Sequence, residues 1–156
     1  MNRLLFLGVT LLSGCLSNDI FWCSSRQNIL NRFGSDVRAA QMILRNADAI
    51  ESPSLGPAGS PSCLVAAYRV LLQDKNAPQH FMDLSRDATL PGRLYALAGL
   101  YEVDPAAAKI LAASLRELEF TQIQLREGCT VSVATPPAIV ARLEADDFRA
   151  SWRWRP

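Results

Sequence analysis

Apolar residues recur at helical spacing through much of the chain. In the segment from Ser35 to Ala49, which starts with Ser35 as a candidate N-cap, they fall on one helix face: Val37, Ala40, Ile43, Leu44 and Ala47. This spacing predicts an amphipathic helix. The next stretch, ESPSLGPAGSP at 51–61, concentrates prolines, glycines and serines. We expect it to form a loop, because this composition disfavours regular elements.

Four further helices are predicted between residues 60 and 118, each behind a local start signal. These signals are polar cap residues or a proline near the first turn: Ser60-Pro61, Asn76 with Pro78, Thr89, and Asp104-Pro105. The side chains expected to face inward are Leu64, Ala67, Tyr68 and Leu71; Phe81, Leu84 and Ala88; Leu94, Leu97, Ala98 and Tyr101; and Ile110, Leu111, Ser114, Leu115 and Leu118. Ala96 and Gly99 indicate that a neighbouring element packs closely on the third of these helices.

The four helices form two successive pairs that are similar to each other. Residues 65–85 can be laid over residues 94–114 with similar residue types at most of the compared positions. Two antiparallel pairs of this kind resemble a short array of HEAT-type helical repeats. The predicted fold class is therefore mainly α, with antiparallel helix pairs in a short helical-repeat or bundle arrangement.

The period of the pattern changes at Phe120, where strand-like alternation begins. Ile123 and Leu125 alternate with polar residues, as do Val131 and Val133, which predicts a β-hairpin over 121–134. A three-residue loop that includes Cys129 would pair Leu125 with Val131 and Ile123 with Val133. We favour it over a two-residue Glu127-Gly128 turn, which would mix the two faces.

The hairpin is followed by a stop signal and one more helix. Pro136-Pro137 ends the strand and opens a helix whose inward residues are Ile139, Val140 and Leu143.

The amino terminus carries an export pattern. Arg3 precedes an apolar stretch from Leu4 to Leu12, which is too short to span a bilayer. The tetrapeptide Leu12-Ser13-Gly14-Cys15 resembles the lipobox of bacterial lipoproteins. This resemblance implies cleavage of residues 1–14 as a signal peptide and a lipid on Cys15.

The same resemblance gives an expected location. Leu16 rather than aspartate follows Cys15, which by the sorting rule of enteric bacteria favours the periplasmic face of the outer membrane. Residues 15–25 are then a tether, and residues 26–156 form a single helical domain. The membrane is the first expected partner, through the lipid on Cys15.

Composition excludes several classes of site. The chain has 16 basic and 15 acidic side chains, and Arg3 lies in the signal, so the chain from Cys15 onwards is neutral and offers no broad basic surface for nucleic acid. The other cysteines are Cys23, Cys63 and Cys129, with no C-x-x-C pair, and His80 is the single histidine. We therefore expect no metal site and no cofactor. If Cys15 carries lipid, the three other cysteines allow one disulfide and leave one thiol; if it does not, two disulfides are possible. We expect Cys63 to pair with Cys129, because both lie in the predicted core whereas Cys23 lies in the tether.

Candidate catalytic groups are few. His80 could be oriented by Asp83 and Asp87 on the same helix, but we favour a solvated surface histidine, since no motif places a nucleophile. Glu144, Asp146 and Asp147 cluster without the spacing of a calcium loop and are interpreted as a solvated helix end.

The C-terminal segment combines tryptophan and arginine. Trp152, Arg153, Trp154 and Arg155 would suit contact with a membrane or an envelope polymer. The alternative, which we favour, is a strap whose tryptophans cover the core.

The function expected from these features is that of a lipid-anchored envelope protein of noncatalytic, interaction or structural type. Its partner would be an envelope protein or polymer. An envelope hydrolase with an unrecognised site around His80 is the alternative.

Overall fold

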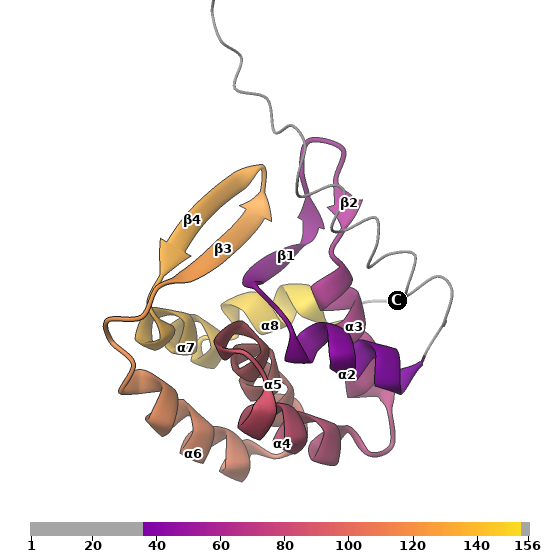
Figure 1. Cartoon of the computed structure of the whole chain (residues 1–156), viewed down its shortest axis with the longest axis vertical. Coiled ribbons are helices and arrows are strands. Elements are labelled where there is room, and N and C mark those ends of the chain that lie inside the picture. Colours follow the sequence, from indigo (N-terminus) through magenta and orange to yellow (C-terminus); the bar gives the residue numbers. More distant parts are fainter. Residues whose placement is uncertain (1–35, 154–156) are drawn as a thin grey trace, which may run out of the picture.

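A computed structural model describes residues 36–153, which fold as a mainly helical domain with one small sheet (Figure 1). The elements that precede the long central helix are α2 (Val37–Arg45), β1 (Ala49–Leu55), β2 (Ser60–Pro61), α3 (Cys63–Gln73) and α4 (Ala77–Asp87). They are followed by α5 (Leu90–Val103), α6 (Pro105–Arg116), β3 (Ile123–Gly128), β4 (Thr130–Ala134), α7 (Pro136–Glu144) and α8 (Asp147–Trp152). The predicted signal, the lipobox and the tether lie outside the described residues.

Helix α5 lies at the centre of the domain. Its residues from Leu94 to Leu100 are buried on every side, and it packs against α2, α3, α4, α6, α7 and β1. One very close contact involves Gly99, where an added Cβ would lie 2.4 Å from ring atoms of Phe81 in α4. The predicted close packing on this helix is therefore confirmed.

The helix starts that depend on local caps are mostly those predicted. Thr89 and Asp104 accept backbone N–H bonds at the starts of α5 and α6, and Asn76 precedes α4. Asp36 caps α2. The predicted start of the first helix of the array at Ser60-Pro61 is wrong by two residues, because Ser62 is the cap of α3 and Ser60–Pro61 form β2.

The predicted loop at 51–61 is also wrong, since this segment forms β1 and its hairpin partner β2. Gly56 and Gly59 have positive φ values of 68° and 64° and make the turn between the two strands. Pro53 lies where the pairing of β1 with β3 is irregular, between Glu51 and Leu55. At such a point a missing N–H removes no regular ladder bond, so the strand tolerates the proline.

The four strands form a mixed sheet in the order β2-β1-β3-β4. Its central pair, β1 and β3, is parallel, and the two outer pairs are antiparallel. The helical class is thus confirmed only in its coarse form, because the sequence predicted an isolated hairpin and no mixed sheet. The HEAT-like repeat stays a prediction.

The register of the β3–β4 hairpin differs from the predicted one. Glu127 pairs with Thr130 and Leu125 with Ser132, across a two-residue Gly128-Cys129 turn. Gly128 has a φ of 57°, which two-residue hairpin turns favour. Our prediction assumed that all apolar residues face the core. Instead Val131 and Val133 lie on the outer face of an edge strand and are 56% and 60% exposed.

Candidate functional site

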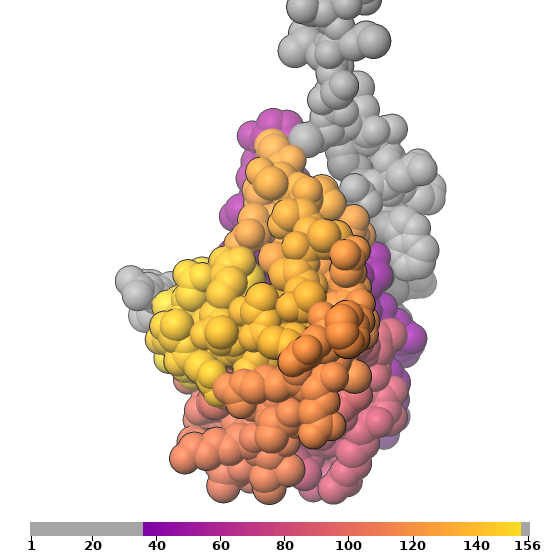
Figure 2. Space-filling model, turned by 90° about the vertical axis from the view of Figure 1, so that its left-hand side faces the viewer, coloured from indigo at the N-terminus to yellow at the C-terminus, as the bar shows by residue number. Residues whose placement is uncertain are grey.

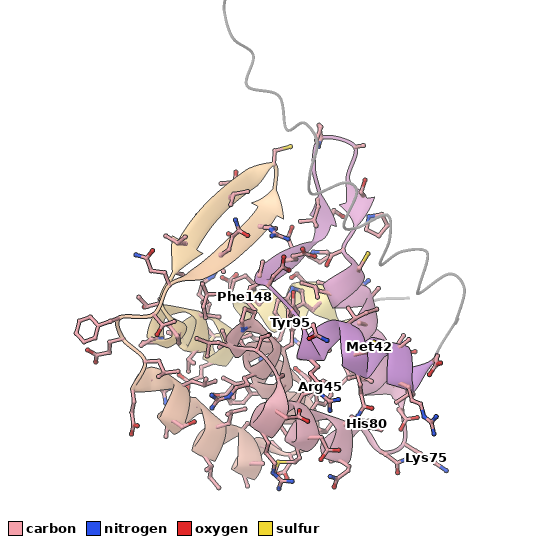
Figure 3. The ribbon with its side chains drawn as sticks, in the orientation of Figure 1. Met42, Arg45, Lys75, His80, Tyr95 and Phe148 are labelled. Atoms are coloured by element: carbon pink, nitrogen blue, oxygen red, sulfur yellow. The ribbon has the colours of Figure 1, made fainter. Side chains whose placement is uncertain are left out.

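His80 lies between three segments rather than on an open surface. Its Nε2 is 2.9 Å from Oδ1 of Asp74, which precedes α4, and its Nδ1 is 2.9 Å from Nε2 of Gln41 on α2. Figure 3 shows His80 below α2 and near Lys75, which lies in the turn before α4. The side chain is only 15% exposed. The expectation of a solvated histidine is therefore not met.

The partners of His80 are not the predicted ones. Asp83 accepts a hydrogen bond from Gln79 and Asp87 pairs with Arg45, so neither orients the ring. Helical periodicity could not find Asp74, because it lies in the turn before the helix that carries His80.

The contacts of His80 assign its protons. An ionised Asp74 accepts from Nε2–H, which leaves the Nδ1 lone pair to accept from the Gln41 amide. Bonds from the backbone N–H of Asn76 and from His80 hold the pKa of Asp74 below its usual value, so this carboxyl is ionised at neutral pH. With both ring nitrogens occupied, His80 links α4 to α2 and has no lone pair aimed at a substrate.

A second polar group lies on the sheet and was missed by the sequence analysis. Glu51 is 5% exposed; its Oε2 accepts a bond of 2.7 Å from Ser62 Oγ, and its Oε1 lies 3.2 Å from Arg126 Nη1. Arg126 also binds Asp48 and Gln124. Both carboxylate oxygens of Glu51 therefore bond to the protein itself and join β1, β3 and the start of α3. We interpret this role as structural.

The backbone of Glu51 completes this junction. Its N–H donates to the Tyr95 hydroxyl, at 2.9 Å, and its carbonyl accepts from Trp152 Nε1, at 3.0 Å. One residue of β1 therefore holds α3, α5, α8 and β3 together.

The C-terminal segment is a helix where the sequence predicted an extended strap. Trp152 is fully buried and stacks on Tyr95 and Phe148, so the predicted covering of the core holds for this residue. Arg153 pairs with Glu102 and Asp146. Trp154 and Arg155 lie outside the described residues, and their contact with a membrane or polymer stays a prediction.

The acidic cluster after α7 is held by arginines. Glu144 pairs with Arg116, Asp147 pairs with Arg142, and Asp146 pairs with Arg149 and Arg153. These carboxylates remain partly exposed, as expected for a solvated helix end, and they also join α6, α7 and α8 through ion pairs. In the described part of the chain no group of histidine, cysteine and acidic residues is arranged to hold a metal ion.

The predicted Cys63–Cys129 disulfide is not borne out. Cys63 is buried in the first turn of α3, whereas Cys129 is exposed at the tip of the β3–β4 hairpin. The predicted and the observed turn both contain Cys129, but the sequence alone could not show that this tip is exposed while the start of α3 is buried. Cys15 and Cys23 lie outside the described residues.

Four of the five large exposed apolar side chains in the described part of the chain lie on one side of the molecule, and the fifth, Met42, lies on α2. The four are Ile110 on α6, Phe120 in the loop before β3, and Val131 and Val133 on β4, with exposures of 76%, 98%, 56% and 60%. These elements all lie on the left side of Figure 1, with β4 above and α6 below, and this side faces the viewer in Figure 2. We call the surface formed by α6, residues 117–122 and β4 the α6–β4 face.

The predicted inward position of Ile110 is also wrong. Its spacing predicted an inward position, but the buried side of α6 consists of Ala108, Leu111, Ala112 and Leu115. Ser114, which was expected to face inward as well, is exposed. Adjacent apolar residues at 110 and 111 made the face ambiguous in the sequence.

Across residues 36–153, no helix is both long enough and apolar enough to cross a membrane. Comparison of the chain with protein-family models, with curated proteins and with solved structures finds no match.

Proposed function

We propose that this chain is a lipid-anchored protein of the bacterial cell envelope that works by binding another macromolecule through its α6–β4 face. The observation that carries the binding role is the exposure of Ile110, Phe120, Val131 and Val133 on that one face. Large apolar side chains left exposed on a shared face favour an interaction site. The anchor is supported by the lipobox at Leu12-Ser13-Gly14-Cys15.

The edge strand β4 adds a second element of recognition. Within residues 36–153 it pairs with β3 on one side only, and its segment TVSVA contains no charged residue. Natural edge strands are usually protected by charges or prolines against added strands. An unprotected edge favours a partner that adds an extended segment to the sheet.

The lipid anchor can be tested at Cys15. Mass spectrometry of the mature protein should find an acylated Cys15 at its amino terminus, and Cys15→Ala should leave an uncleaved precursor. Cys23→Ala is the matched control and should be processed normally. An unmodified Cys15 in the mature protein would contradict the anchor.

The binding role is tested separately at β4. A photocrosslinking residue at Val131 in the full-length protein should capture a partner, and Val133→Asp should reduce that crosslinking. Met42→Asp on α2, where Met42 is 62% exposed, is the control and should leave it unchanged. Equal crosslinking in both variants would argue against a binding role for β4.

An envelope hydrolase with His80 in its site is the second candidate. The Asp74–His80 hydrogen bond favours it, because a carboxylate often orients a catalytic imidazole. Loss of a hydrolytic activity in His80→Asn, with retention of the fold, would support it. We rank it second because Gln41 occupies the other ring nitrogen.

A further inference from the structure

The outer side of α6 carries an apolar stripe that no described element covers. Ala106, Ile110 and Ala113 are exposed and lie one above the other at successive turns. The opposite side of the helix is buried in the core. In Figure 1, α6 lies at the lower edge of the helical layer, with its outer side away from α5.

Charges along this stripe are unequally distributed between its two ends. Lys109 lies beside Ile110 in the first half, whereas Glu117 and Glu119 follow the last turn. All three are exposed and form no ion pair within residues 36–153. Arg116, the other cation near the end, is already paired with Glu144. The acidic end of one α6 therefore complements the Lys109 half of another α6 that runs antiparallel to it.

We propose that the α6 stripe binds a second copy of this chain in an antiparallel, two-fold arrangement. The two-fold axis lies between Ile110 and Ala113, so Ile110 of each copy packs against the small Ala113 of the other. Small side chains let two helices approach closely. The same axis brings Glu117 of each copy near Lys109 of the other copy, whereas a parallel arrangement would place the glutamates side by side.

This inference rests on the proposed function and names one partner of the α6–β4 face. Anchoring by lipid confines all copies to one membrane surface, which raises their effective concentration. A modest helix–helix interface is then sufficient for association. The centre of the stripe is self-complementary, because the large Ile110 and the small Ala113 lie on opposite sides of the proposed axis.

The test places a photocrosslinking residue at Ala113 of the full-length, membrane-anchored chain. We expect a crosslinked dimer whose joined peptide contains Ile110 of the second copy, as identified by mass spectrometry. The same probe at Met42 on α2 is the matched control and should give no dimer. An absent dimer at Ala113, or equal dimers at both positions, would overturn the proposal.

Two substitutions then test the contacts. Ile110→Asp should lower the dimer yield by about tenfold or more, as for a central interface residue. Glu117→Lys should lower the dimer yield less than Ile110→Asp does. The double variant Glu117→Lys with Lys109→Glu should restore the dimer yield. Lys109, Ile110 and Glu117 are all exposed, so the variants should fold, and their resistance to proteolysis should match that of the parent protein. An unchanged yield in Ile110→Asp would overturn the interface.

The result also separates this inference from the proposed function. Crosslinking of Ala113 to a different protein, without a dimer, would overturn the second copy as partner and leave the binding role standing. If neither the probe at Ala113 nor the probe at Val131 gives a crosslink, both the second-copy interface and the proposed binding role are contradicted.

Discussion

Single residues of this protein are fixed by close contacts that allow little change. Gly99 faces the ring of Phe81, and Gly92 faces the carbonyl oxygen of Leu44, at 2.4 Å and 2.3 Å from an added Cβ. Glycine weakens a helix relative to alanine, so its presence inside α5 has a packing reason. Here that reason is the approach of α4 and α2 to the central helix.

Gly99→Ala is expected to destabilise the domain by about 1–3 kcal/mol, because its Cβ overlaps the Phe81 ring. The free energy of unfolding from urea denaturation measures this. Adding Phe81→Leu should recover part of the loss by making room for the methyl group. If Gly99→Ala were more stable than the parent, α4 would have to lie further from α5.

At the scale of elements, the N-cap residues of the helices differ in the side-chain bonds that they make. The Ser62 hydroxyl accepts the Val65 N–H at the start of α3 and donates to the buried Glu51. Asn76 occupies the equivalent position of α4 but makes no side-chain cap bond. The two positions therefore form a matched pair for measuring what the Ser62 cap bond and the Ser62–Glu51 bond contribute together.

Ser62→Ala should lower the free energy of unfolding by about 2 kcal/mol, since it removes a cap and one bond to a buried carboxylate. Asn76→Ala should change it by less than about 0.5 kcal/mol. Thermal and urea unfolding of both variants measure the difference. Equal effects would show that the two Ser62 bonds together contribute nothing.

At the scale of the whole molecule, burial couples the three tyrosines to folding. Burial raises the pKa of Tyr68 and of Tyr95 well above the usual value of 10. Partial burial and the bond to Glu144 raise the pKa of Tyr101 to about 12. The sequence contains no other tyrosine.

Because the folded state keeps these phenols neutral, their contribution to stability is complete below about pH 10. It is lost as the pH rises from there through the folded pKa of Tyr101, about 12. We expect little tyrosinate absorbance at pH 10–11 while the circular dichroism stays native. In denaturant all three should titrate near pH 10. Early ionisation in the folded protein would contradict the burial of Tyr68 and Tyr95.

Local signals in the sequence were enough for much of the helical part. The cap and proline signals at Asn76, Thr89, Asp104 and Pro136 are read within one turn, so the starts of α4, α5, α6 and α7 could be predicted. Strand alternation likewise placed β3 and β4, but not their register. Helix α8 was missed, because its six residues are too few for a periodic pattern.

Tertiary structure alone decided the sheet and the candidate site. Glu51 meets Arg126 only because β1 lies parallel to β3, and His80 meets Gln41 only because α2 packs on α4. Which face of α6 is buried was equally undetermined, since Ile110 and Leu111 are both apolar. The sequence by itself determined what depends on neighbouring residues: the starts of α4, α5, α6 and α7, the near balance of basic and acidic side chains, and the lipobox pattern. Contacts between distant segments follow from packing of the whole core, which no local pattern contains.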